Sequence, residues 1–132
     1  MIYLDTAALV KLIRREPESY ALVGWLDEQD PGLLVSSALA EVELPRALLR
    51  TEPELLSEVP ALLARIASYE IDELVRRTAA SYRTPGLRAL DAIHLATAQA
   101  VFGDQLRSFV TYDQRLFDCA LTLGLPASAP GR

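Results

Sequence analysis

Short apolar stretches alternate along the chain with longer stretches whose apolar residues recur at helical spacing. Residues 1–5, 33–37, 68–72 and 107–111 have the length and composition of buried strands. Helices are predicted over residues 6–16, 17–29, 38–50, 52–66, 72–83, 87–103 and 112–124, and a short edge strand within 125–130. This alternation predicts one α/β domain over residues 1–132, a three-layer α/β/α sandwich with a central, mostly parallel sheet of four to five strands.

Three local features of the pattern give more specific predictions. Tyr20, Val23 and Leu26 are expected to form the apolar stripe of the helix over 17–29, and residues 30–32 to close that helix as a turn. The segment 87–103 is expected to be the most regular helix of the chain, with Gly103 as its stop. Ser36 or Ser37 can cap the helix that follows the second strand.

Composition predicts a soluble, cytoplasmic protein. Of the 132 residues, 51% are hydrophobic and 23% are charged. No apolar run reaches the roughly 18 residues that a membrane span needs, and residues 1–5 reach an acid before any signal-peptide core forms. The lone Cys119 lies in an apolar stretch and is interpreted as core filler.

Two aspartates stand where strands end. Asp5 closes the first strand and Asp113 lies just past the strand over 107–111, so both belong to the same edge of a parallel sheet, where ligands bind in such folds. Each has a structural alternative. Asp5 can cap the next helix, and Thr111 with Gln114 has the spacing of a capping box that leaves Asp113 as a first-turn acid.

Asp91 is harder to explain structurally. It lies inside a helical segment with Leu90, Ile93 and Leu95 as neighbours, where an unpaired charge is costly, so it is expected to face a cation or a polar cleft. His94, the only histidine, is interpreted as a packed side chain hydrogen-bonded within the helix layer. Without a second histidine or a cysteine cluster a usual zinc site is excluded, whereas acidic oxygens select a hard cation such as Mg²⁺ or Mn²⁺.

The stretches IYLDTAALVKL, SSALAEVELPRAL, LRALDAIHLATA and FVTYDQRL, in this order, resemble the PIN domain of VapC-type toxins from bacterial toxin–antitoxin modules. The resemblance implies a helix sandwich around a parallel sheet and a Mg²⁺- or Mn²⁺-dependent endoribonuclease. It implies metal binding by Asp5, Asp91 and Asp113, with Glu43 favoured over Glu41 as the fourth acid. Thr6 and Thr111 supply supporting hydroxyls, although Ala7 stands where many relatives have serine.

The same resemblance implies a VapB-like antitoxin, which covers the acidic groove, and a homodimer. Apolar residues of the first two helices are candidates for partner contact, namely Leu12, Tyr20 and Trp25, with a core position as the alternative for Trp25. A non-toxin PIN nuclease acting in RNA processing or on DNA, or a catalytically silent PIN binding module, are the alternative functions. The presence of acids at all four positions argues against the silent module.

The net charge of −5 at first argues against an RNA substrate. Without the four candidate acids, however, 14 of the 18 acidic residues remain against 13 basic ones, so the remaining surface is close to neutral. Scattered basic residues of this kind are usually solvated surface, and a path for the RNA backbone is the alternative interpretation of the set: Lys11, Arg14, Arg15, Arg46, Arg50 and Arg88.

Overall fold

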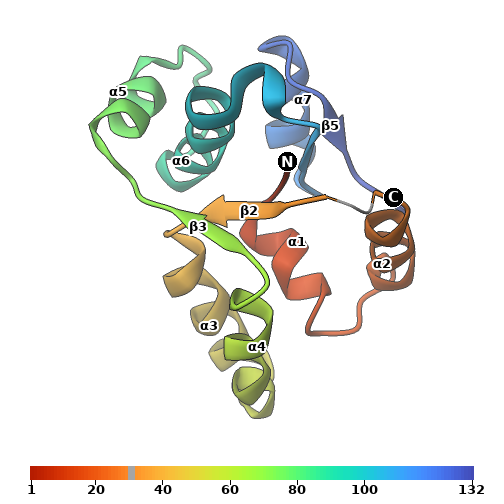
Figure 1. Ribbon diagram of the computed structural model, residues 1–132. Helices are drawn as coiled ribbons and strands as arrows, with labels where there is room; N and C mark the ends of the chain where they lie inside the picture. The colour runs from red at the N-terminus through yellow and green to blue at the C-terminus, as the bar shows by residue number, and fades with distance from the viewer. Residues whose placement is uncertain (30–31) are drawn as a thin grey trace.

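A five-stranded sheet with all its strand pairs parallel forms the centre of the computed structural model, which describes residues 1–29 and 32–132 (Figure 1). The strands are β1 (Ile2–Leu4), β2 (Leu34–Ser37), β3 (Ala67–Tyr69), β4 (Ser108–Val110) and β5 (Ala127–Ser128). Their order across the sheet is β3-β2-β1-β4-β5. The predicted parallel sheet and the edge strand near the C-terminus are thus confirmed.

Helices cover both faces of this sheet and complete the predicted sandwich. In Figure 1 one layer lies below the sheet: α1 (Thr6–Lys11), α2 (Ser19–Glu28), α3 (Ala40–Thr51), the short 3₁₀ helix η1 (Pro53–Glu58) and α4 (Val59–Leu63). The other layer lies above: α5 (Glu73–Ser81), α6 (Ala89–Thr97), the π-helical turn η2 (Ala98–Phe102), the 3₁₀ turn η3 (Gly103–Gln105) and α7 (Gln114–Thr122). No helix in the described ranges is long and apolar enough to cross a membrane.

The strand β1 is apolar throughout because both of its faces are buried. Ile2 and Leu4 pack into a core with α1 to α4, whereas Tyr3 packs into a second core with α6 and α7. All three side chains are fully buried, as alternation along a central strand requires. The sheet therefore has a hydrophobic core on each side.

Two predicted features of the first layer are wrong. The helix α1 ends at Lys11 and does not reach residue 16. The stripe predicted for α2 is wrong at two of its three residues, because Tyr20 is 93% exposed and Val23 also faces solvent, and it is confirmed at Leu26, which packs against the core. Leu22 is the fully buried residue of α2, with Trp25 and Leu26 packed against the same core.

The predicted regular helix over 87–103 is also wrong in its second half. The α-helical geometry of α6 ends at Thr97, and the chain continues through the π-helical turn η2. Ala98 and Phe102 are both buried in that turn, so the wider winding keeps its apolar side on the core. Gly103 does stop the helix, with the positive φ of 51° that glycine tolerates. The turn predicted at 30–32 falls mostly on residues 30 and 31, outside the described residues.

Candidate active site

The strand order reverses direction between β1 and β4, which are neighbours in the sheet but distant in the sequence. Such a switch point in a parallel sheet opens a crevice at the carboxyl ends of the strands, where ligands usually bind. Asp5 directly follows β1, and its backbone N–H donates to the carbonyl of Val110 at the end of β4 (3.3 Å). Asp113 follows shortly after β4. Both predicted acids therefore lie at the switch point.

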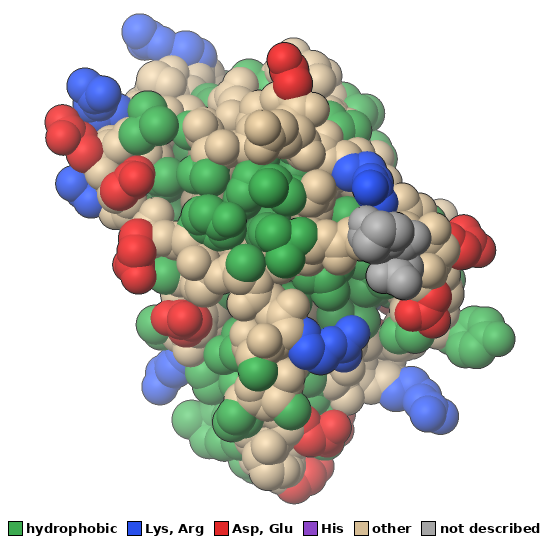
Figure 2. All heavy atoms as spheres, in the orientation of Figure 1, with side chains coloured by type: hydrophobic (Ala, Val, Ile, Leu, Met, Phe, Trp, Pro, Cys, Tyr) green, Lys and Arg blue, Asp and Glu red, His purple; other side chains and the backbone are tan. Residues whose placement is uncertain are grey.

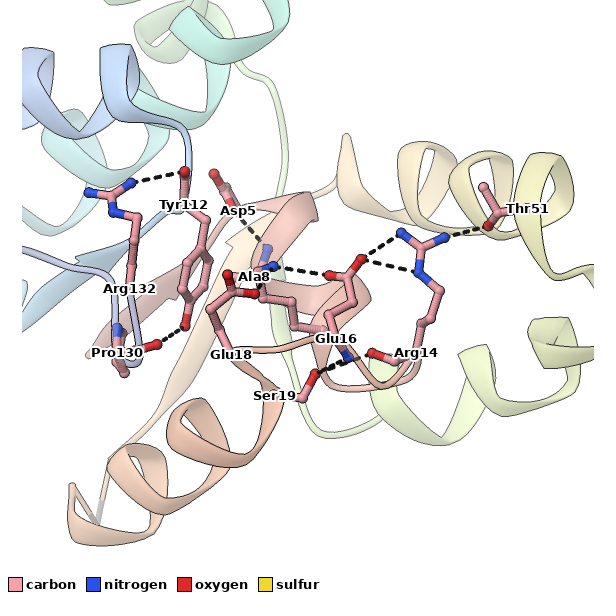
Figure 3. A network of polar contacts seen from close by, with 11 residues as sticks. Asp5, Ala8, Arg14, Glu16, Glu18, Ser19, Thr51, Tyr112, Pro130 and Arg132 are labelled. Atoms are coloured by element: carbon pink, nitrogen blue, oxygen red, sulfur yellow. Dashed lines mark hydrogen bonds and ion pairs between the residues drawn. The ribbon is translucent and has the colours of Figure 1, made fainter.

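Asp5 and Asp113 each cap a helix with one carboxylate oxygen. Oδ1 of Asp5 accepts from the N–H of Ala8 (2.9 Å; Figure 3), and Oδ1 of Asp113 accepts from the N–H of Leu116 (3.1 Å). The capping box expected at Thr111 is wrong, because Asp113 is itself the N-cap and its N–H donates to the hydroxyl of Thr111 (3.2 Å). Capping fixes these two carboxylates at the sheet edge, so it does not compete with a role in a site.

Glu43, on α3, is tied to the same edge by two hydrogen bonds. Its Oε1 accepts from the hydroxyl of Thr6 (2.6 Å) and lies 2.8 Å from Nε2 of His94. Partial burial favours a higher pKa for Glu43, but the hydrogen bonds from His94 and Thr6 hold the pKa below its ordinary value. Glu41, the alternative on this helix, is exposed to solvent.

Asp91 lies in the first turn of α6 and interacts with the other acids. Partial burial raises its pKa, and the negative charges of Asp113 and Glu43 raise it further. The pKa of Asp5 is raised too, chiefly by its burial, with the charge of Asp91 adding to the effect. The structure thus brings all four predicted acids into electrostatic contact at one edge of the sheet.

A cluster of carboxylates in which two pKa values are raised is a place where a positive charge is stabilised. Its donors are carboxylate oxygens, which suit a hard divalent cation. As arranged here, no group of three or more His, Cys, Asp or Glu side chains within residues 1–29 and 32–132 is placed to hold a metal ion. The chemistry and charge of the set fit such a cation, whereas the side chains do not surround one point.

A cleft of about 410 Å³ opens beside two of the acids, Asp91 and Asp113. Arg88 and Arg115 also line this cleft, and neither is in an ion pair with a residue that the structure describes. The positive charge of Arg88 acts to lower the pKa of Asp91 and partly offsets its increase. Arg115 was not among the basic residues considered for RNA contact, although it lies only two residues after Asp113 in the sequence.

The alternative interpretation as a basic path is wrong at two of its members. Lys11 is paired with Glu16 (3.0 Å) and Glu18 (2.8 Å). Arg14 is paired with Glu16 (2.7 Å; Figure 3). Acids of the same loop therefore neutralise both cations. On the face drawn in Figure 2, acidic and basic side chains are interspersed, so this face offers no continuous basic surface.

The apolar residues predicted for partner contact divide into two groups. Leu12 and Trp25 are partly buried and pack against the core. The core position given as the alternative for Trp25 is therefore confirmed. Tyr20 is the exposed member, and together with Val23 it borders a groove between α1 and α2. Leu12 also lines this groove, so two of the three residues predicted for partner contact border it, whereas Trp25 does not.

A family model and a similar protein identify the family of this chain, and two solved structures share its fold. The family model described as "PIN domain" matches residues 2–120. The protein named "Ribonuclease VapC35" from Mycobacterium tuberculosis is 53% identical over 133 residues, covering 100% of this chain and 98% of that protein. The structure of VapBC2 from Rickettsia felis bound to a promoter DNA fragment matches with a TM-score of 0.75 at 16% identity, covering 98% of this chain and 99% of the other. A toxin–antitoxin complex from Klebsiella pneumoniae matches at 21% identity with a TM-score of 0.67, covering 89% and 90%.

Proposed function

The chain belongs to the PIN-domain family, and from this premise we propose that it is a VapC-type toxin, an endoribonuclease that hydrolyses phosphodiester bonds of RNA. The observation that carries the proposal is the set of four acids at the switch point of the sheet, in a chain 53% identical over its length to a protein named a ribonuclease. The proposal includes one site: Asp5, Glu43, Asp91 and Asp113.

Asp5, Asp91 and Asp113 would hold Mg²⁺ or Mn²⁺ through their carboxylate oxygens. When bound, such an ion lowers the pKa of water and stabilises charge on phosphoryl oxygens. Glu43, kept ionised by its hydrogen bonds to Thr6 and His94, accepts a hydrogen bond from the attacking water and orients it. The hydroxyl of Thr111 supports the backbone of Asp113.

Arg88 and Arg115 would bind the RNA backbone on the cleft side of the acids. Guanidinium groups form paired hydrogen bonds with phosphate oxygens, and these two have no competing ion pair in the described part of the chain. A local pair of cations explains how a protein with a net charge of −5 binds RNA without a broad basic surface.

The proposed partner is a VapB-like antitoxin, acting on a homodimeric toxin in the cytoplasm, where the RNA is found. The structural match to a complex of toxin and antitoxin supports this assignment. Tyr20 and Val23, exposed beside the groove between α1 and α2, are the apolar contacts offered to it. Replacing both by serine would then weaken capture of the antitoxin and leave RNA cleavage by the free toxin intact.

The function is tested by incubating the purified protein with a mixture of structured and single-stranded RNAs, with Mg²⁺ and with a chelator. Cleavage is expected only with the ion, and Glu43→Gln should lose it while Glu41→Gln, altered on the same helix, retains it. Cleavage without any growth arrest on expression would favour a PIN nuclease that is not a toxin. Equal cleavage by both glutamine variants would overturn the assignment of Glu43.

A further inference from the structure

The only histidine of the chain has both of its ring nitrogens engaged. His94 is buried in α6, with its Nδ1 lying 2.7 Å from the hydroxyl of Tyr3 and its Nε2 lying 2.8 Å from Oε1 of Glu43. Tyr3 lies on β1, and Glu43 lies on α3 in the opposite helical layer. The imidazole therefore connects the two helical layers across the sheet edge. The prediction that its hydrogen bonds lie within its own helical layer is wrong.

The chemistry of these groups fixes which atom donates in each hydrogen bond. An ionised carboxylate only accepts, so the proton on Nε2 points to Glu43. In the neutral ring, Nδ1 then has a lone pair and accepts from the hydroxyl of Tyr3. The hydroxyl of Tyr3 carries one proton, and Nδ1 lies within hydrogen-bond distance to accept it.

We propose that Tyr3 and His94 form a buried hydrogen-bond relay that positions the carboxylate of Glu43 for the attacking water. This inference rests on the proposed function. His94 is in this view a positioning residue, because it acts through Glu43 and not on the substrate. Thr6 completes the arrangement, since its hydroxyl donates to the same Oε1 and lies 3.2 Å from Nε2 of His94.

The partial burial of Glu43 explains why its side chain needs fixed hydrogen-bond partners. The side chain of Glu43 is 25% exposed and that of His94 only 3%, so the carboxylate stands at the boundary between solvent and the interior. A flexible glutamate at such a boundary keeps several rotamers unless fixed partners select one. Tyr3 is itself held by its stacked contact with Phe109 (5.2 Å between ring centroids), which makes the far end of the relay rigid.

Two substitutions separate positioning from packing. Tyr3→Phe removes one hydroxyl and keeps the ring, and is expected to lower kcat about 10-fold with little change in the KM for RNA. His94→Gln retains an amide donor for Glu43 and a carbonyl acceptor for Tyr3, so it should retain far more activity than His94→Leu. The matched control is Tyr82→Phe, which removes another hydroxyl that is bonded only to Gln99 (2.7 Å) and should keep full activity.

The tautomer of the single histidine provides a readout that requires no RNA. In ¹⁵N spectra of the full chain, His94 is expected as the neutral form with its proton on Nε2, and Tyr3→Phe should give a mixture of forms. A proton on Nδ1 in the wild type, an unchanged spectrum and kcat in Tyr3→Phe, or equal activity of the Gln and Leu variants would each overturn the relay. If no variant and no wild-type sample cleaves RNA, the proposed function fails, and the spectra alone decide whether the relay exists.

Discussion

At the residue scale, the four acids are held by the structure, and two of them destabilise the fold when they are ionised. Asp5 and Asp113 cap helices, and Glu43 is held by two hydrogen bonds. Asp5 and Asp91 nevertheless have raised pKa values, first because burial disfavours their charged forms. A group whose folded pKa lies above its unfolded pKa destabilises the fold wherever it is ionised, so these two carboxylates weaken the metal-free protein at neutral pH.

Asp91→Asn should therefore raise stability and abolish activity together. Removal of the charge relieves its repulsion with Asp113 and Glu43, so the melting temperature of the metal-free protein is expected to rise by a few degrees. Ion-dependent RNA cleavage should fall by at least about 100-fold. Calorimetry and a cleavage assay measure the two effects, with the exposed Asp118→Asn of α7 as the control that changes neither. An active Asp91→Asn protein would remove Asp91 from the site.

The two arginines of the cleft make a second prediction at this scale. Arg88→Ala and Arg115→Ala, each in a Glu43→Gln background that spares the RNA, should weaken binding of a single-stranded oligonucleotide about 10-fold. Each should also reduce the slope of log affinity against log salt by about 0.7, as expected for the loss of one phosphate contact. Arg65→Ala, which alters an exposed arginine in the turn between α4 and β3, is the control. If Arg88→Ala or Arg115→Ala weakens oligonucleotide binding no more than Arg65→Ala does, that arginine does not bind phosphate.

At the element scale, the residues of the proposed site lie at the N-termini of helices. Asp5 is the N-cap of α1 and Asp113 is the N-cap of α7, so each of these acids joins the carboxyl end of a strand to the helix that follows it. Asp72 makes the same bond at the start of α5, where its Oδ1 accepts from the N–H of Val75 (3.0 Å). Asp72 is not one of the four residues of the proposed site, so it is a helix cap without a proposed role in cleavage.

Asp113→Asn and Asp113→Ala should separate these two roles. Asparagine still caps, so Asp113→Asn is expected to retain stability and lose cleavage. Asp113→Ala should lose cleavage and also about 1 kcal/mol of unfolding free energy in urea titrations. The matched control, Asp72→Ala, should lose a similar free energy and keep its activity. If Asp113→Asn cleaves RNA normally, the acid is only a cap.

At the scale of the whole molecule, the switch point joins acids that the sequence separates widely. Asp5 and Asp113 lie at neighbouring strand ends because β1 and β4 pair in the centre of the sheet. The second helical layer contributes Asp91 through α6, and the first contributes Glu43 through α3. Because both layers supply negative charge to one edge, a bound cation would stabilise the whole fold.

Divalent ions should therefore raise the melting temperature in a pH-dependent way. Stabilisation by protonated Asp5 and Asp91 is complete below their unfolded pKa values and is lost as the pH rises through the raised folded values. At pH 7, Mg²⁺ or Mn²⁺ at ten times its Kd should add about 1.4 kcal/mol, and less under acidic conditions where protons compete. Potassium at matched ionic strength is the control. An equal rise in Asp91→Asn would place the ion elsewhere.

The amino-acid sequence was enough to predict the alternation of strands and helices, the parallel sheet and the acids near its strand ends. These features depend on local apolar periodicity and on chain order, which the sequence displays directly. It failed at the stripe of α2 and at the π-helical turn after α6, because which helix face is buried depends on contacts with distant segments.

The fold adds contacts that the sequence did not show, since Glu43, which the family resemblance favoured over Glu41, is hydrogen-bonded to Thr6 and His94. It also turned the lone histidine from a packing residue into the link between Tyr3 and Glu43, and it brought Arg115 into the cleft. The physical reason is the same in each case. Hydrogen bonds, burial and charge repulsion act through space, between residues as far apart in the chain as Tyr3 and His94, and no local pattern records which of them will meet.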